Sequence, residues 1–192
     1  MLTPILYDAV TLNNFGAIDS LNVLQRRHEN HPEPRWTEQV YEEIEKGVKL
    51  GYSHCKRVID QKLWFGEPAK LNHKEQIQFF QTLAALSDGT GKNKEEPTVT
   101  KNHGEAASIL VAERHEGTFM TDDAAAYDFA KKRSETRKTN VIASIDLLRE
   151  AVAMGELNND KAVALATGIE EKGRFLRRIH SDKIRDPNYF SR

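Results

Sequence analysis

With 192 residues, of which 39% are hydrophobic and 30% charged, the chain is expected to form one helix-rich globular domain, with or without an extension, rather than a disordered chain. A formal net charge of −1 excludes a basic field over the whole molecule, so nucleic-acid binding would need a local patch or metal ions. A single cysteine, Cys55, excludes an intrachain disulfide and a thiolate metal site of the CxxC type.

The first predicted element is a short buried strand at residues 4–7, which ends directly at Asp8. A helical spacing of apolar residues follows over residues 11–24, and Thr11 is suited to cap that helix. Residues 28–35 are polar and contain two prolines, which indicates a loop.

Three more helices and a strand are predicted before residue 101. Thr37 is an expected N-cap, and residues 52–61 form a short helix after it. Residues 63–65 are predicted as a short strand, and Asn72 is expected to cap the next helix. The apolar faces of the two capped helices are Val40, Ile44 and Val48, and Ile77, Phe80, Leu83 and Leu86. The glycines and charges of residues 87–101 predict a mobile loop.

Helices and strands alternate in the second half of the chain. The predicted order is helix 103–112, strand 118–121, helix 124–132, strand 140–143, helix 145–154 and helix 159–175. This alternation favours an α/β fold of three layers, α/β/α, around a central, mainly parallel sheet. Neither a GxGxxG nor a Walker-type phosphate-binding motif is present.

Acidic residues follow two of the predicted strands. Asp8 ends the first strand, and Asp122 and Asp123 stand at the carboxyl end of residues 118–121. Parallel strands bring their carboxyl ends to one edge of an open α/β sheet, and ligands bind outside that edge. We therefore expect Asp8 and Asp123 to converge.

Two further acids come from predicted helices. Glu105 lies in the first turn of helix 103–112, and Glu43 lies beside the apolar face that Val40 and Ile44 define. Four carboxylates in one place repel each other unless a cation lies among them. Oxygen ligands suit Mg²⁺ or Mn²⁺ rather than zinc or copper, and a pair of such ions can activate water for phosphodiester cleavage. The pattern predicts a metal-dependent nuclease if the four acids meet.

Each acid also has an ordinary structural interpretation. Asp8 could cap the next helix, and Asp122 and Asp123 are both favoured N-cap residues. Glu105 could simply favour the helix dipole, and Glu43 could belong to a solvated helix face. We take Asp123 as the metal ligand, with Asp122 as the alternative or as an auxiliary ligand.

Four pieces of the sequence occur in a characteristic order. They are LYDAVTL (6–12), VYEEI (40–44), GEA (104–106) and FMTDD (119–123). They give a first-strand Asp, a helix Glu, a Gly-Glu-Ala helix start and a Thr-x-Asp after a strand. This combination resembles the PIN-domain family, whose most numerous members are VapC-type toxin ribonucleases. Residues 141–157 resemble the closing part of one PIN subgroup, so the resemblance covers most of residues 4–160.

The resemblance implies an acidic quartet that binds Mg²⁺ or Mn²⁺, and it implies that Thr11 and Thr121 orient Asp8 and Asp123 through hydrogen bonds. The quartet would be Asp8, Glu43, Glu105 and Asp123. Family members cut single-stranded RNA, many are dimers, and many are inhibited by an antitoxin. The expected function is therefore a PIN-like endoribonuclease with RNA as substrate, with an antitoxin and a second copy of the chain as candidate partners.

The end of the chain is locally basic. We place the PIN-like domain at residues 1–160 and treat residues 161–192 as a helical basic extension packed on it. The candidates for contact with RNA phosphates are Arg174, Arg177 and Arg178. A solvated helix face is the alternative interpretation of these arginines.

Two other functions stay open from the sequence. One is a catalytically degenerate PIN-like module that only binds partners or nucleic acid, and the other is a DNA nuclease in repair or phage defence, because the same metal chemistry cuts either polymer. The chain shows no signal peptide and no apolar run of the ~18 residues that a membrane span needs. We therefore expect a cytoplasmic protein without membrane contact.

Overall fold

A three-stranded parallel sheet lies at the centre of the fold. The computed structural model describes residues 2–88, 102–174, 176 and 189–190. The strands are β1 (Ile5–Tyr7), β2 (Thr118–Met120) and β3 (Asn140–Ile142), in the order β1-β2-β3. Both pairs are parallel, as predicted. All three residues of β1 are buried, which explains its uninterrupted apolar sequence, because a strand covered on both faces needs no polar side.

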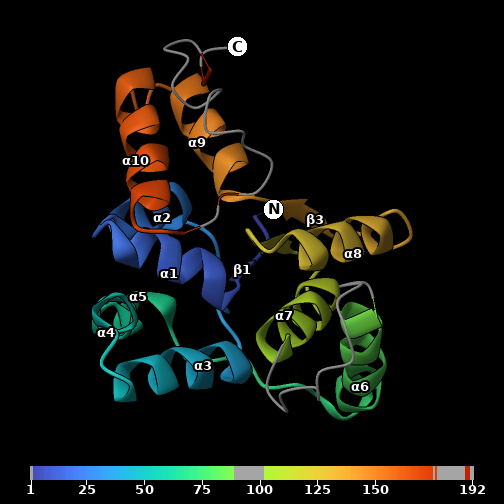
Figure 1. Ribbon diagram of the computed structural model, residues 1–192. Helices are drawn as coiled ribbons and strands as arrows, with labels where there is room; N and C mark the ends of the chain where they lie inside the picture. Colours follow the sequence, from blue (N-terminus) through green and yellow to red (C-terminus); the bar gives the residue numbers. More distant parts are fainter. Residues whose placement is uncertain (1, 89–101, 175, 177–188, 191–192) are drawn as a thin grey trace.

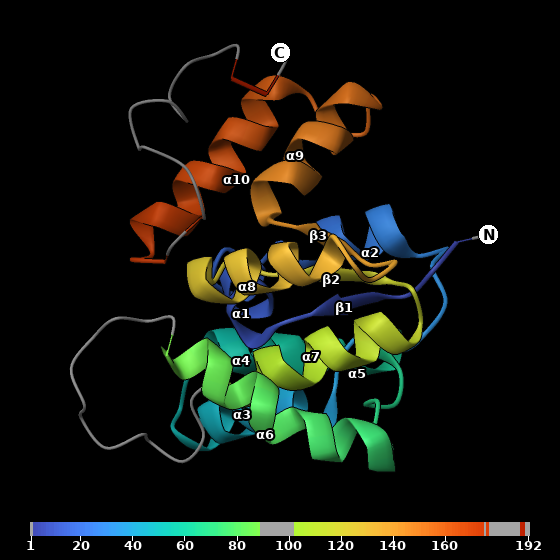
Figure 2. The same cartoon turned by 90° about the vertical axis from the view of Figure 1, so that its right-hand side faces the viewer.

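Ten helices surround the sheet in the described part of the chain (Figure 1). They are α1 (Ala9–Ala17), α2 (Leu21–His28), α3 (Glu38–Lys49), α4 (Ser53–Asp60), α5 (Lys62–Phe65), α6 (His73–Asp88), α7 (His103–Arg114), α8 (Ala124–Ser134), α9 (Ser144–Ala153) and α10 (Asn159–Glu171). Figure 2 shows α9 and α10 on one side of the sheet and α3, α4, α6 and α7 on the other. The arrangement is α/β and consistent with three α/β/α layers.

The backbone beyond β1 extends this arrangement. The amide of Tyr7 donates to the carbonyl of Arg35 at 2.9 Å, and Thr37 forms a parallel bridge with Ala69. The side chain of Thr37 then caps α3 by accepting from the Val40 amide, which confirms the predicted cap. The start of α3 is thus anchored beside the carboxyl end of β1, and this anchor positions Glu43.

The predicted helix over residues 11–24 is in fact two helices. The chain breaks at Asp19, whose φ of 54° lies in the left-handed region, and α2 begins at Leu21. Thr11 is not the N-cap of the first helix. Asp8 takes that role, since its carboxylate accepts from the Thr11 amide. Since α1 begins at Ala9, directly after Asp8, Thr11 already lies inside the helix and is not its N-cap.

The predicted strand at residues 63–65 is wrong, because these residues belong to the helical turn α5. A short apolar run cannot be assigned to strand or helix by periodicity alone. Its aromatic side chains pack inward instead of pairing along an edge. Phe65 stacks on Trp36 with ring centroids 4.8 Å apart, and the Trp36 indole donates to the carbonyl of Gly66 at 2.9 Å.

The apolar face predicted for α6 is also partly wrong. Ile77 and Phe80 are 60% and 71% exposed. The face that packs inward consists of Glu75, Phe79, Thr82 and Leu86. Glu75 contributes to this orientation, because it forms a capping box with Asn72 and an ion pair of 2.8 Å with Arg114 of α7. The predicted cap at Asn72 is confirmed.

Several expectations concern the ends of the described ranges. The predicted loop beyond α6 falls almost wholly on residues 89–101, which lie outside the described residues. Arg177 and Arg178 also lie outside the described residues. The expected boundary at residue 160 falls within the first turn of α10, which packs on α9 and α1. Within the described ranges, no helix has both the length and the apolar character needed to cross a membrane.

Candidate functional site

The carboxyl ends of the three strands meet at one edge, as the parallel pairing requires. The Asp8 amide donates to the carbonyl of Met120 at 3.2 Å, and the Thr121 amide donates to the carbonyl of Ile142 at 3.0 Å. The sheet pairing thus continues one residue past β1 and one residue past β2. These bonds fix the backbone of Asp8 and Thr121 at the edge where the acids were expected.

Asp8 is completely buried at this edge. Its Oδ1 accepts from the Thr11 amide at 2.7 Å, and its Oδ2 accepts from the Thr121 hydroxyl. Burial and then the charge of Glu105 raise the pKa of Asp8 well above its usual value, although the bonds from both threonines oppose this shift. Asp8 and Glu105 therefore lie close enough for their charges to repel.

Thr121 connects two of the predicted ligands. Its hydroxyl donates to Asp8 and accepts from the Asp123 amide at 3.0 Å. Asp123 is half-buried and caps α8, because its Oδ1 accepts from the Ala126 amide at 2.8 Å. Its Oδ2 accepts no hydrogen bond from the residues that the structure describes. That oxygen is therefore the one with capacity for a further ligand.

Glu43 approaches the same acids from α3. A Cβ added at Gly104 would lie only 3.3 Å from Glu43 Oε2 and 3.1 Å from a methyl carbon of Val40, so the missing side chain makes room for this carboxylate. Burial of the carboxyl group and then the charge of Asp8 raise the pKa of Glu43 to about 7. The residue as a whole is exposed, so Glu43 lies at the rim of the acidic edge, reachable from solvent.

Asp122 is used differently from its neighbour. Its Oδ1 accepts from the Ser144 amide at 3.0 Å, while its Oδ2 accepts from the Ser144 hydroxyl at 2.5 Å and the Asn14 amide group at 2.8 Å. These bonds join the ends of β2 and β3 to α1. A structural role accounts for this buried carboxylate, and its role as a metal ligand stays a prediction.

Sequence reasoning missed Asn14 and Ser144, which hold Asp122. Asn14 is completely buried on the inner face of α1, where a polar residue needs a partner. Its spacing of three residues from Thr11 was the available signal. The signal for Ser144 was its position after the end of a strand, which it shares with Asp8 and Asp122.

Asp8 therefore interacts electrostatically with both Glu43 and Glu105, and Thr121 links Asp123 to Asp8. Carboxylate oxygens alone suit Mg²⁺ or Mn²⁺, and a cation would relieve their repulsion. By donor chemistry, these residues fit such an ion. In the described residues, however, no three His, Cys, Asp or Glu side chains come together in a group that could hold a metal ion.

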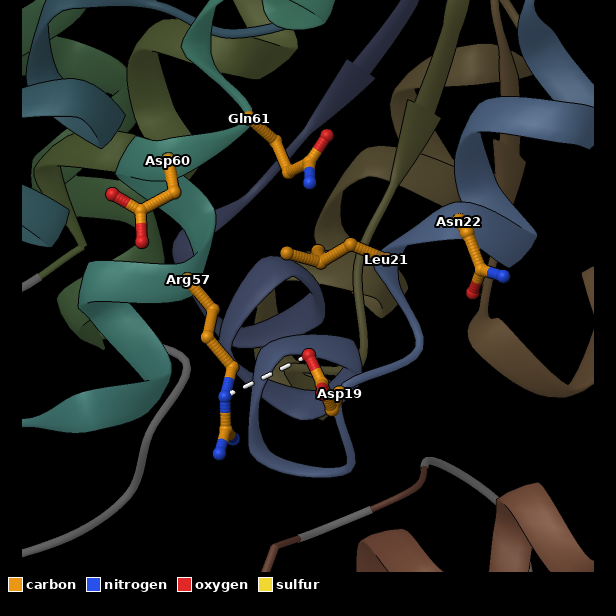
Figure 3. A pocket seen from close by; sticks show the side chains of 6 residues that line it. All are labelled: Asp19, Leu21, Asn22, Arg57, Asp60 and Gln61. Atoms are coloured by element: carbon orange, nitrogen blue, oxygen red, sulfur yellow. Dashed lines mark ion pairs between the residues drawn. The ribbon is translucent and has the colours of Figure 1, made fainter.

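A pocket of about 230 Å³ lies elsewhere, at the opposite end of α1 from Asp8 (Figure 3). Arg57 and Asp19 form an ion pair of 3.7 Å on its wall, and the Arg57 guanidinium also donates to the carbonyl of Gly16 at 2.8 Å. Its guanidinium thus caps the carboxyl end of α1. We assign the site to the acidic edge, because this pocket contains none of the predicted ligands.

Comparison of the chain with protein-family models, with curated proteins and with solved structures gave no match.

Proposed function

We propose that the protein is a PIN-like, metal-dependent endoribonuclease that cleaves single-stranded RNA. The observation that supports this proposal most is the position of Asp8. It is buried at the carboxyl edge of a parallel sheet, with the charges of Glu43 and Glu105 acting at the site and with Thr121 joining it to Asp123. Burial of several carboxylates is unfavourable for folding, so a function that needs their charge is the simplest reason for it.

In this proposal Asp8, Glu43, Glu105 and Asp123 would hold Mg²⁺ or Mn²⁺. When bound, a pair of these ions would supply a more acidic water and would neutralise charge on the phosphodiester. The chain itself would position the ligands. Thr121 orients Asp8, and the first turn of α8 orients Asp123 by holding its Oδ1. Glu43, at the rim, would contact the ion nearest to solvent.

The test is cleavage of a 5′-labelled single-stranded RNA by the purified protein in Mn²⁺, and again after addition of EDTA. We expect cleavage that EDTA stops. Asp8→Asn and Asp123→Asn should abolish it while the protein stays folded, whereas Glu42→Gln should not, because Glu42 is an exposed neighbour of Glu43. Full activity of both aspartate variants in excess Mg²⁺ would refute the assignment.

A second candidate is a degenerate module that binds RNA or a protein partner without cleaving. The absence of a three-residue metal group from the described residues favours it. The same assay separates the two, since binding without cleavage in Mn²⁺ would support the module. A matched DNA oligonucleotide tests the third interpretation, a DNA nuclease. An antitoxin partner and a homodimer stay predictions of the family resemblance.

A further inference from the structure

Three residues form a small cluster beside the acidic edge, which we name the Arg174 cluster: Tyr52, His54 and Arg174. Arg174 follows α10, and a guanidinium nitrogen donates to His54 Nε2 in α4. The Tyr52 ring stacks on the His54 ring, with centroids 5.5 Å apart and an angle of 11° between the planes. Figure 1 shows why residues so distant in sequence can meet, because α10 and α4 both lie against α1.

The backbone holds Arg174 in place. Gly173 has a φ of 68°, and its amide donates to the carbonyl of Glu170 at 2.8 Å. The Arg174 amide donates to the carbonyl of Ile169 at 3.2 Å. This pair of bonds is the Schellman ending of a helix, for which glycine is the favoured residue. The position of Arg174 is therefore determined by the end of α10.

The cluster combines a cation with an open aromatic face. His54 accepts from Arg174, so its ring is neutral, and burial followed by the charge of Arg174 lowers the pKa of His54. In the described ranges no carboxylate forms an ion pair with Arg174. Tyr52 is 51% exposed. A guanidinium that retains its charge beside an exposed ring matches the two parts of a nucleotide, a phosphate and a base.

The cluster also lies next to the acids. Cys55 follows His54 in α4, and its Sγ would lie 2.4 Å from a Cβ added at Gly47 of α3. The helices α3 and α4 therefore touch at this point. Gly47 is one helical turn beyond Glu43 on the same face of α3, a distance of roughly 6 Å along the axis. Burial raises the pKa of the Cys55 thiol, the charge of Arg174 opposes this shift, and the charge of Glu43 adds to it. Arg174 and Glu43 therefore both lie near one buried thiol.

We propose that the Arg174 cluster binds a nucleotide that flanks the cleaved bond, with Arg174 on a phosphate and Tyr52 stacked on an unpaired base. This inference rests on the proposed function, since it places the RNA strand along the line from Glu43 to Arg174. A base inside a duplex has both faces covered by neighbouring base pairs and offers none to Tyr52. The cluster therefore selects single-stranded over duplex RNA.

The test is binding of a fluorescent single-stranded RNA to the full chain, measured by anisotropy at several salt concentrations. Asp8→Asn is present throughout to prevent cleavage. We expect Tyr52→Ala to weaken binding roughly tenfold without changing the salt dependence, whereas Tyr52→Phe keeps the affinity. Arg174→Ala should weaken binding to a similar extent and reduce the slope of log K against log salt by about 0.7. Arg174→Lys should keep that slope, and Lys161→Ala, an exposed cation of α10, should change neither quantity.

Any of three results would overturn the proposal. The first is no binding of single-stranded RNA, and the second is unchanged affinity in Tyr52→Ala and Arg174→Ala. The third is that these two variants lose affinity for duplex RNA as much as for single-stranded RNA. Cleavage by the protein without Asp8→Asn is measured separately. If binding depends on the cluster but no RNA is cleaved, the proposed nuclease activity is refuted and nucleotide binding by the Arg174 cluster is supported. If RNA is cleaved but the binding affinity does not depend on Tyr52 or Arg174, nucleotide binding by the cluster is refuted and the proposed nuclease activity is supported.

Discussion

A single hydroxyl group holds two of the proposed ligands at the sheet edge. Thr121 donates to Asp8 and accepts from the Asp123 amide. We expect Thr121→Val, which keeps the shape but removes the hydroxyl, to lower RNA cleavage by roughly 10- to 100-fold, because groups that orient metal ligands have effects of this size. It should also lower the free energy of unfolding by about 1–3 kcal/mol, because a buried Asp8 oxygen loses its donor.

Thr121→Ser is the matched control, since it keeps the hydroxyl and removes only a methyl group. We expect its cleavage rate to stay within a few-fold of the parent, measured at saturating Mn²⁺. If Thr121→Val and Thr121→Ser lose activity equally, the methyl contact and not the hydrogen bonds explains the effect.

A second residue-scale feature, away from the site, makes stability depend on pH. His28 is buried, its Nδ1 lies 2.5 Å from the Tyr7 hydroxyl, and burial, followed by the charges of His31, Arg27 and Arg35, lowers its pKa to about 3. The unfolded chain binds a proton near pH 6.5 and the folded chain does not. The contribution of neutral His28 is thus complete above pH 6.5 and decreases as the pH falls toward 3.

From this group alone we expect a loss of roughly 1.5 kcal/mol of unfolding free energy between pH 6.5 and pH 5. His28→Asn places an amide near the position of Nδ1 and cannot titrate, so its stability should fall less over the same interval. Urea unfolding at pH 8, 6.5 and 5 measures both profiles. Parallel profiles would show that His28 remains neutral in the unfolded chain or charges without penalty.

The sequence predicted those features of the site that are local. Asp8 ends a strand and Thr37 precedes a helix, and both can be recognised from a few neighbouring residues. The use of Asp122 could not be predicted in this way. Its partners Asn14 and Ser144 are 108 and 22 residues away, and only the folded sheet edge brings them together. The choice between Asp122 and Asp123 therefore depended on the family resemblance alone.

At the scale of elements, the contact between α3 and α7 determines where Glu43 can lie. Gly104 allows this contact, because a Cβ there would approach Val40 to 3.1 Å and Glu43 Oε2 to 3.3 Å. We expect Gly104→Ala to displace the Glu43 carboxylate and raise the Mn²⁺ concentration needed for half-maximal cleavage several-fold. The melting temperature should change little, since the better helix propensity of alanine, about 1 kcal/mol, offsets the crowding.

Gly168→Ala in α10 is the matched control. Its added Cβ would lie 3.3 Å from a methyl carbon of Ile18, a contact of the same tightness that is remote from the acidic edge. The Mn²⁺ requirement of Gly168→Ala should equal that of the parent. A similar shift in both variants would mean that crowding acts through general stability and not through Glu43.

Element types were more predictable than element faces. The helices and the three strands follow from apolar spacing, but the inward face of α6 does not. Apolar Ile77 and Phe80 point outward, because the inward face carries Phe79 and the ion pair between Glu75 and Arg114, which are 39 residues apart. Residues 63–65 became a helical turn for a related reason, since the aromatic packing around Trp36 outweighs the β propensity of the run.

For the molecule as a whole, the acidic edge is a source of instability in the absence of a cation. Asp8 and Glu43 have raised pKa values, so their ionisation near neutral pH opposes folding. Asp8→Asn removes one charge and keeps the N-cap, since Asn caps as well as Asp. We expect this variant to melt no lower than the parent in EDTA at pH 8, although the substitution alters a completely buried residue.

Metal binding should make the parent protein more stable than Asp8→Asn. An ion that binds only the folded protein at 100 times its dissociation constant stabilises it by about 2.7 kcal/mol. For a chain of this length that corresponds to a rise in melting temperature of roughly 5–10 °C. We expect Mn²⁺ to produce this rise in the parent and little or none in Asp8→Asn, as measured by calorimetry or circular dichroism. An equal rise in both would place the bound ion away from Asp8, and no rise in the parent would leave the buried carboxylates without the cation that the proposed nuclease requires.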